Sequence, residues 1–521
     1  MTLSIPRLYF LANAVLLLSL FQKIPAIPKY DVNIDTLLQD NPTWGVAFRE
    51  TQTLWGVRSA IRGGLNLFGL ETPVLGPPFT IPFEFPIFQN LSALFCSAFN
   101  LDVAFGSRLI SLFFFTLTGL IYAVLIRNLF GELHSLVFSI IYCFTPFSFV
   151  WSTTALIESF TNFTLSLFFL WFHKYLKSHK TFFLLLSILS LTITSLSKIT
   201  TSFPLSLVIG AALILNSTNS KKSDNLDKLR RPIPKSFLYV SIIAASVIPG
   251  FVWSRFADRQ KESSLFTSWL SSSNLQSWNF GNLKQRLDLF SWLAIGGRLY
   301  LLIGFVLFLI PILFFHVKSN FHAIPLVAAT FFPPLVYFNL YFIHDYYFMA
   351  IHPFACITAS LCISALINRF FAGRNRKLLY NSSILVLVAL LSTWSWTPGH
   401  DYKRHLYGPQ LGNLDYIDFI KSNTTANDLI LTYGCDWNPA YLYLMDRRGL
   451  SLPSKFDNLK ETLSLVDSEI GLNHFRYIVD CSRSSESNQF TDLIKTNVLL
   501  GIYPRVYQTK EYLDKANGHL N

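Results

Sequence analysis

The sequence predicts an α-helical polytopic membrane protein with about eleven spans and a small C-terminal α/β domain outside the cytoplasm. Only 14% of its 521 residues are charged and 51% are hydrophobic, whereas soluble chains carry about 25% charged residues. The 50 Phe suit a lipid-facing surface better than an aqueous core. The net charge of +12 forms no dense Lys/Arg stripe, so we expect no nucleic acid partner.

Apolar runs long enough to cross a bilayer recur along residues 1–397, the predicted transmembrane domain. A spanning helix needs about 20 mostly apolar residues for a hydrocarbon core about 30 Å thick. We interpret the N-terminal run as an uncleaved span, because residues 24–27 (Ile-Pro-Ala-Ile) offer no small-x-small cleavage site. The predicted spans begin near Leu8, Leu109, Ser135, Ser159, Thr181, Thr201, Ser236, Leu299, Ala323, Phe348 and Leu378.

The Lys and Arg residues of the short loops fall on one side of these spans. Cytoplasmic loops of membrane proteins carry such an excess, so we expect a bacterial plasma (inner) membrane protein with a cytoplasmic N-terminus and an extracytoplasmic C-terminus. The long loops 23–107 and 255–292 are then extracytoplasmic. The basic positions are Arg7, Arg127, Lys174, Lys177, Lys180, the segment from Lys221 to Lys235, Lys318, Arg374, Arg376 and Lys377.

Residues 398–521 are richer in charge and alternate strand-like with helix-like patterns, which predicts a soluble α/β domain. No glycine-rich nucleotide motif occurs in it. Its role stays open between substrate gating, partner contact and a purely structural one. The predicted strands are Leu429–Tyr433 and Tyr477–Asp480, and the predicted helices are Pro439–Asp446, closed by Gly449, and Asn458–Val466.

The six Cys residues form no CxxC pair and no Cys/His pair at zinc spacing, so the sequence predicts no metal site and no cofactor. Cys435 and Cys481 each directly follow a predicted strand. If the two strands are parallel neighbours, these residues lie side by side in an oxidising compartment. A disulfide and two free thiols are both open.

The first long loop carries the residues best suited to chemistry. Residues 47–61 read as an amphipathic helix along the membrane surface, stopped by Gly63-Gly64. Glu50 stands in its first turn, and Arg58 and Arg62 follow as an i, i+4 pair. A carboxylate can take a proton from a hydroxyl, and guanidinium groups can stabilise a departing phosphate. The alternative is a helix-capping Glu50 with arginines that bind lipid headgroups.

Further ionisable residues stand in the first long loop and at the ends of predicted spans. Glu84 is held between aromatics in a segment with four prolines, 77–86, although a rigid connector with one exposed acid fits the same pattern. Glu158 and Lys198 stand at outer ends of spans, where a charge indicates function by default; for Lys198, snorkelling is the alternative. The run His344-Asp345-Tyr346-Tyr347 ends a span, and an interfacial aromatic belt explains its tyrosines but not His-Asp.

In this order, these features resemble the GT-C superfamily, especially the branch with the protein O-mannosyltransferases and the lipid A aminoarabinose transferases. Arg49 stands where relatives often have Asp, and Glu84 where aminoarabinose transferases have Lys, which disfavours a metal role and that particular sugar. The matching segments are 48–53 (Phe-Arg-Glu-Thr-Gln-Thr), 84–88 (Glu-Phe-Pro-Ile-Phe), Arg108-Leu109, Leu196-Ser197-Lys198, 278–281 (Trp-Asn-Phe-Gly) and 344–347.

The resemblance implies an inverting transferase of hexosyl or pentosyl groups that takes its sugar from a polyprenyl phosphate carrier. The acceptor is a hydroxyl on a lipid, a glycan or a protein. Glu50 is then the catalytic base and no metal is expected. Lys198, His344, Arg58 and Tyr346 are expected to bind the lipid phosphate, and Glu84, Glu158 and Asp345 to position sugar or acceptor.

Two other classes of protein share part of this pattern. A transporter or lipid-linked sugar flippase also has many spans, but it should show internal repeats and interrupted helices at the membrane midplane. The sequence shows no convincing repeat, and its ionisable residues gather on one side. A membrane scaffold that displays residues 401–521 would have no use for the proline-fixed acidic loop.

Overall fold

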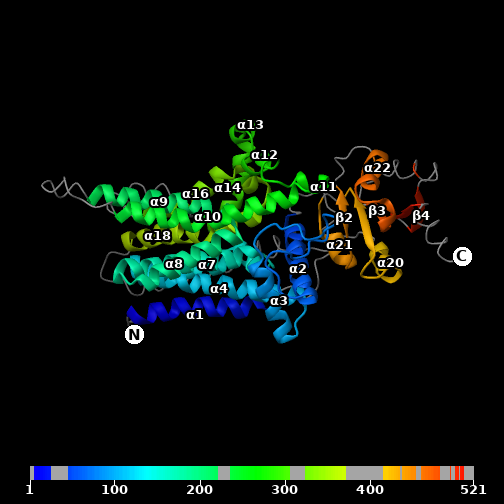
Figure 1. Cartoon of the computed structure of the whole chain (residues 1–521). Helices are drawn as coiled ribbons and strands as arrows, with labels where there is room; N and C mark the ends of the chain where they lie inside the picture. The colour runs from blue at the N-terminus through cyan, green and yellow to red at the C-terminus, as the bar shows by residue number, and fades with distance from the viewer. Residues whose placement is uncertain are drawn as a thin grey trace. The chain divides into compact units, whose positions relative to one another are not determined.

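The computed structural model of the chain (Figure 1) separates into two compact units by its internal contacts. We call them the helical unit (Met1–Lys29, Ala98–Phe256 and Ser272–Leu406) and the mixed unit (Tyr30–Ser97, Ala257–Ser271 and Tyr407–Asn521). The structure describes residues 5–24, 45–220, 235–304, 323–370, 415–434, 437–452, 459–480, 493, 499–503 and 505–509.

The helical unit is built from apolar helices that pack along one another. Helix α7 contacts α4 and α8, α1 contacts α5, and α16 contacts α9 and α18. The elements are α1 (Ile5–Lys23), α4 (Val103–Phe130), α5 (Glu132–Phe144), α6 (Pro146–Trp151), α7 (Ile157–Ser178), α8 (Thr181–Ser197), α9 (Ile199–Ser220), α10 (Lys235–Lys261), α12 (Gln276–Phe280), α13 (Leu283–Leu287), α14 (Leu289–Ile303), α16 (Ala323–Val336), α17 (Phe338–Ile343), η7 (Asp345–Ala350) and α18 (His352–Phe370).

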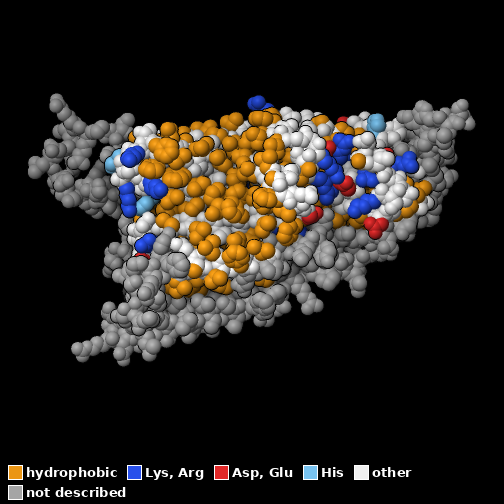
Figure 2. Space-filling model, turned by 90° about the horizontal axis from the view of Figure 1, so that it is seen from below, with side chains coloured by type: hydrophobic (Ala, Val, Ile, Leu, Met, Phe, Trp, Pro, Cys, Tyr) orange, Lys and Arg blue, Asp and Glu red, His pale blue; other side chains and the backbone are white. Residues whose placement is uncertain are grey.

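Aromatic and aliphatic side chains fill the core of this unit and also cover its outside. Leu165 and Phe168 of α7 pack with Leu191, Leu205 and Ile243 from three neighbouring helices. Figure 2 shows hydrophobic side chains spread over the outer surface of the helices, with basic side chains at the end of the unit. The exposed apolar residues include Leu185, Leu189, Leu207, Phe237, Ile248 and Val252. Such a surface is expected where lipid is the solvent.

Two of the described helices, Val103–Phe130 and Ser236–Lys261, are long and apolar enough to cross a membrane by length and composition. Several shorter apolar helices accompany them, among them Thr181–Ser197 and Ile199–Leu213. The predicted spans that fall on the described residues thus correspond to apolar helices. The run that begins near Leu378 lies outside the described residues.

The mixed unit contains a five-stranded sheet in the order β2-β1-β3-β5-β4. Strand β1 is parallel to both β2 and β3, whereas β5 is antiparallel to β3 and β4. Its elements are α2 (Gly45–Gly63), α3 (Ile87–Phe99, which ends in the helical unit), α11 (Leu265–Ser268), α20 (Asp415–Asn423), β1 (Leu429–Tyr433), α21 (Ala440–Met445), β2 (Arg448–Leu452), α22 (Leu459–Glu469), η8 (Leu472–His474), β3 (Phe475–Asp480), β4 (Leu499–Tyr503) and β5 (Val506–Thr509).

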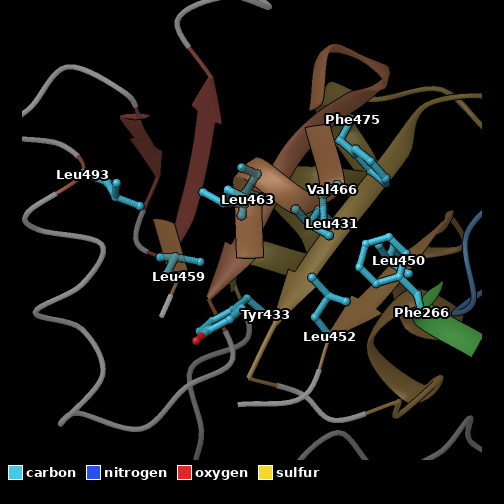
Figure 3. Close-up of a cluster of buried hydrophobic side chains, with 11 residues drawn as sticks. Phe266, Leu431, Tyr433, Leu450, Leu452, Leu459, Leu463, Val466, Phe475 and Leu493 are labelled. Carbon is cyan, nitrogen blue, oxygen red and sulfur yellow. The ribbon is translucent and has the colours of Figure 1, made fainter. Parts of the chain in front are cut away.

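The core of the mixed unit draws on distant parts of the chain (Figure 3). Leu431, Leu450 and Phe475 of the sheet pack with Leu463 of α22. Phe266, from the short helix α11, joins the same cluster. The segment 257–271 therefore belongs to this core, although it lies far from the strands in sequence.

The first long loop also joins the sheet, through residues 73–76. The N–H of Gly449 donates to the carbonyl of Pro73 (2.8 Å), that of Ser451 to Val74 (2.9 Å), and that of Gly76 to Gly449 (3.0 Å). This segment pairs antiparallel with the edge strand β2. The boundary expected near residue 398 therefore does not coincide with the grouping by contacts, because the loop contributes to the same sheet.

The predicted strands 429–433 and 477–480 are confirmed, as are the helices near 439–446 and 458–466. The prediction that Gly449 closes the first of these helices is wrong. Helix α21 ends at Asp446, which adopts the left-handed conformation (φ 56°). Gly449 lies inside β2, where an added Cβ would stand 1.7 Å from the carbonyl oxygen of Ile430, so this strand needs glycine there.

Candidate functional site

A one-residue break between two helices presents Lys198. Its N–H donates to the carbonyl of Thr194 (2.9 Å) at the end of α8, and its own carbonyl accepts from Ser202 (3.1 Å) in α9. The residue itself is extended (φ −159°). Because it belongs to neither helix, its side chain leaves the packed helix faces at the turn between them.

The amino group of Lys198 forms an ion pair with Glu158, in the first turn of α7. Both side chains are buried, with 4% of Lys198 and 1% of Glu158 exposed. The amine also lies 5.0 Å from the ring centre of Tyr346 and 4.3 Å from that of Tyr347. The opposite ends of α7 and α8 carry Lys174, Lys177 and Lys180, so this pair lies at the far end of the hairpin.

The predicted cluster 344–347 thus contacts the ion pair of Glu158 and Lys198. His344 caps the C-terminus of α17, and its ring lies tilted against those of Tyr346 (5.2 Å between centroids) and Trp278 (5.9 Å). Asn162, one helical turn after Glu158, donates to the carbonyl of Met349 (2.6 Å), which ties α7 to η7. Helix α7, the α8–α9 break and η7 therefore form one polar site, which we call the lysine site.

Asp345 of the same segment forms an ion pair with Arg298 of α14. The guanidinium also points toward the carbonyl of Ile343 (3.5 Å). The sequence prediction missed Arg298, because we placed the start of a span at Leu299. The signal was present, since an arginine inside the apolar stretch 289–303 is costly and indicates function.

In the mixed unit, the predicted helix 47–61 is confirmed as α2, which ends at Gly63. Glu50 is fully buried, and because α2 begins at Gly45, the prediction that it lies in the first turn is wrong. The preceding residue, Arg49, forms an ion pair with Glu84 and donates to the side chain of Gln52 (2.7 Å). The proline-rich segment therefore brings Glu84 back to α2, where its partner Arg49 directly precedes Glu50.

A second cation, Lys261, belongs to the same neighbourhood. Its amine pairs with Asp258 (3.7 Å) and lies 5.4 Å from the ring centre of Phe83, the residue before Glu84. Sequence analysis gave Lys261 no role and placed it within the long extracytoplasmic loop 255–292. The mixed unit thus holds, besides Glu50, two acids and two cations from three separate segments: Glu84, Asp258, Arg49 and Lys261.

Arg58, predicted to bind lipid phosphate, contacts α21 of the mixed unit. It donates to the carboxylate of Asp446 (2.8 Å) and to the carbonyl of Tyr443 (2.9 Å). Arg62 donates to the other oxygen of the same carboxylate (2.7 Å). Burial alone would raise the pKa of Asp446, but the hydrogen bond from Arg62 and the charge of Arg58 outweigh it, so the pKa lies below its ordinary value.

Solved structures of similar shape show what this architecture is. The apo oligosaccharyltransferase of Archaeoglobus fulgidus aligns at TM-score 0.58 and 11% identity, over 90% of this chain and 69% of that one. ArnT from Cupriavidus metallidurans, bound to undecaprenyl phosphate, aligns at TM-score 0.57 and 12% identity, over 96% and 97%. Both are glycosyltransferases of the GT-C superfamily. The chain has the GT-C fold.

A third structure with the GT-C fold, the archaeal oligosaccharyltransferase AglB of Archaeoglobus fulgidus, contains an inhibitory peptide and a dolichol-phosphate. It aligns at TM-score 0.53 and 10% identity, over 90% of this chain and 69% of that one. No protein-family model and no curated protein sequence matches the chain. GT-C proteins are integral membrane proteins, in agreement with the apolar outer surface of the helices.

The part of the chain that the structure describes bears on the metal and disulfide predictions. Among the described residues, no three His, Cys, Asp or Glu side chains come together in a way that could hold a metal ion. Cys96, Cys143, Cys356 and Cys362 are buried free thiols. Strands β1 and β3 are parallel neighbours, which is the condition for the two residues to lie side by side, but Cys435 and Cys481 lie outside the described residues.

Proposed function

We propose that this chain is a glycosyltransferase that moves a sugar from a polyprenyl phosphate carrier to an acceptor hydroxyl on the extracytoplasmic side, with inversion at the anomeric carbon. The observation that supports it is the buried Lys198, which lies against two tyrosine rings in a chain with the GT-C fold. A buried ammonium at the end of apolar helices suits an anionic headgroup whose tail remains in lipid. ArnT and AglB, which share this fold, bind such lipids in their own structures.

The lysine site offers what a phosphate leaving group requires. As the bond between the anomeric carbon and the phosphate oxygen breaks, its electron pair stays on the phosphate, which gains one negative charge. Cations and donors placed there beforehand stabilise that charge. We assign Lys198 as the main contact, with His344 and Tyr346 as further donors. Arg298 adds a cation that sequence analysis did not predict.

The acidic residues act on the acceptor hydroxyl and on the sugar. Glu50 accepts the proton of the acceptor hydroxyl, whose oxygen attacks the anomeric carbon in line and inverts it. Glu84 and Asp345 position acceptor or sugar from their ion pairs with Arg49 and Arg298. Glu158 has one carboxylate oxygen, Oε2, without a hydrogen-bond partner among the described residues, and that oxygen is suited to accept a sugar hydroxyl.

Binding of the carrier is tested with purified protein in detergent and undecaprenyl phosphate, measured by native mass spectrometry. We expect Lys198→Met to weaken binding by about tenfold or more, as the loss of a charge-assisted contact implies. Lys177→Met, which changes an exposed lysine at the other end of α7, should leave it unchanged. Equal binding by Lys198→Met and the parent protein would contradict the proposal.

Transfer is tested separately with undecaprenyl phosphate sugars. Removal of a general base lowers turnover by about 10²- to 10⁴-fold, so we expect Glu50→Gln to keep carrier binding and lose transfer. Glu469→Gln, an exposed acid of α22, is the matched control. Full turnover by Glu50→Gln would remove Glu50 from the reaction. Bilayer flipping of the carrier without transfer would favour a flippase.

Sugar and acceptor can be found in cells. Mass spectrometry of glycolipids, surface polysaccharides and glycoproteins, with and without the gene, should show one class that lacks a single hexose or pentose residue. Cells that differ in no glycan would contradict transferase activity. The class that changes then supplies donor and acceptor for the purified protein.

A further inference from the structure

Asp446 ties two turns of α2 to the end of α21. One carboxylate oxygen accepts from Arg58 (2.8 Å) and the other from Arg62 (2.7 Å). These arginines stand four residues apart and so project from the same face of the helix. A single carboxylate thereby holds the last two turns of α2.

The same face of α2 also packs on an aromatic residue of α21. The guanidinium carbon of Arg58 lies 3.9 Å from the ring centre of Tyr443. Trp55, three residues earlier, meets that ring edge to face, with 6.4 Å between centroids. Asp446 is itself fixed, because it caps α21 in the left-handed conformation and its N–H donates to the carbonyl of Tyr443 (3.2 Å). The contact combines charge, stacking and defined backbone geometry.

The chain that follows α2 is tied to the next element of the same unit. Residues 73–76 pair with β2, as described above, and Glu71 accepts a hydrogen bond from Arg448 (3.1 Å) at the start of that strand. Helix α21 and strand β2 are consecutive, separated by two residues, Asp446 and Arg447. Residues 440–452 therefore hold both α2 and the segment after it.

We propose that residues 440–452 form a clamp that sets the position of α2, and that Asp446 is a positioning residue for the reaction of Glu50. The proposal rests on the function proposed for Glu50. Glu50 precedes Arg58 by eight residues of one helix, about 12 Å along its axis. A rotation or shift at the clamp is therefore transmitted to the carboxylate, and misplacement by about 1 Å can lower a rate about 10²-fold.

Because the side chains of the clamp are partly exposed, a positioning role of Asp446 can be distinguished from a role in global stability. Asp446 is 31% exposed and Arg62 is 53% exposed, and such surface ion pairs add little to global stability. The loss of the carboxylate charge is therefore expected to leave the unfolding temperature nearly unchanged. It should nevertheless loosen α2, whose last two turns depend on that charge.

Hydrogen–deuterium exchange of the full-length protein in detergent tests the clamp without any substrate. We expect Asp446→Asn to speed exchange in peptides from 45–63 at least about threefold, while peptides from β1 and α22 stay unchanged. Asp446→Glu, which keeps the charge, should restore much of the protection. The matched control is Asp428→Asn, an acid of the same unit whose carboxylate accepts hydrogen bonds from the N–H and the hydroxyl of Thr425.

Turnover with an undecaprenyl phosphate sugar supplies the second readout. Asp446→Asn should lower kcat about tenfold or more with KM for the carrier unchanged, and Asp446→Glu should recover part of kcat. Unaltered exchange of 45–63 in Asp446→Asn would overturn the clamp whatever the activity. Faster exchange together with a fully active Glu50→Gln would instead keep the clamp and remove the role of Glu50.

Discussion

At the scale of single residues, variants of the ion pair between Glu158 and Lys198 should change the stability of the protein and its binding of the carrier differently. Removal of one partner from a buried pair leaves an uncompensated charge and costs about 3–5 kcal/mol, whereas an uncharged replacement of both is often neutral. We therefore expect Lys198→Met to lower the unfolding temperature in detergent and the double variant Glu158→Gln/Lys198→Met to recover it. Neither variant should bind undecaprenyl phosphate. Full stability of Lys198→Met would show that the pair is not buried.

Lys23 is a buried lysine that the proposed reaction does not use. Its amine donates to the carbonyl of Ser148 (3.2 Å) and lies 4.7 Å from the ring centre of Phe115. That carbonyl also accepts from Ser152 (3.2 Å), so it stays satisfied without the lysine. We expect Lys23→Met to be neutral or stabilising, since it removes the cost of a buried charge and keeps the volume. A clear drop in unfolding temperature would point to a needed cation.

The lowered pKa of Asp446 sets the pH range in which the clamp persists. A carboxyl with a depressed pKa stabilises the folded state above its unfolded value, about 3.9, and that contribution is lost as pH falls through the folded pKa. Arg58 and Arg62 face this carboxylate from α2. Exchange of α2, corrected for intrinsic rates, should therefore be constant from pH 8 to about pH 5. A change near pH 6 would implicate another group.

At the scale of elements, Gly449 should control how the first loop attaches to the sheet. Its Cβ position is blocked by the carbonyl of Ile430, and its backbone bonds both Pro73 and Gly76. Since overpacking costs about 1–3 kcal/mol or more, we expect Gly449→Ala to separate β1 from β2 and to expose 64–76 to proteolysis. Gly501→Ala in β4, where an added Cβ would have none of the described residues other than its chain neighbours within 4 Å, is the control. Equal proteolysis of both variants would contradict this pairing.

Sequence patterns predicted those helices and strands whose periodicity and ends are marked by neighbouring residues. Helix α2 and strands β1 and β3 combine apolar periodicity with clear stops, and their boundaries were predicted within two residues. Strand β2 was missed because it is short, contains Gly449 and directly follows α21. The strand pairing of 73–76 could not be predicted, because it joins segments about 370 residues apart and no local pattern encodes a distant partner.

In the candidate site, too, the residues themselves could be predicted from local sequence, whereas their contacts could not. Glu158, Lys198 and the run 344–347 were predicted as costly charges at the ends of spans, and the structure brings them together. Their pairing depends on how helices pack, which sequence periodicity does not specify. Arg58 was assigned to phosphate from its charge alone, whereas its contact with Asp446 depends on the tertiary fold.

At the scale of the whole molecule, the apolar helices and the distribution of basic residues together predict which parts face the cytoplasm. The turn between α7 and α8 carries Lys174, Lys177 and Lys180, and basic loops are retained inside. The lysine site lies at the other end of the same hairpin. If the proposed orientation holds, that site and the sheet of the mixed unit are both extracytoplasmic, where a flipped lipid carrier presents its sugar.

Thiol labelling of intact cells tests this orientation. In a background in which the six native Cys are replaced by Ser, Ser178→Cys at the α7–α8 turn should react with a membrane-impermeant maleimide only after permeabilisation. Ser468→Cys, on the exposed end of α22, should react in intact cells. Retained binding of undecaprenyl phosphate would show that both variants fold. Labelling of Ser178→Cys in intact cells would place the basic turn outside, and the lysine site would then face the cytoplasm, away from flipped carriers.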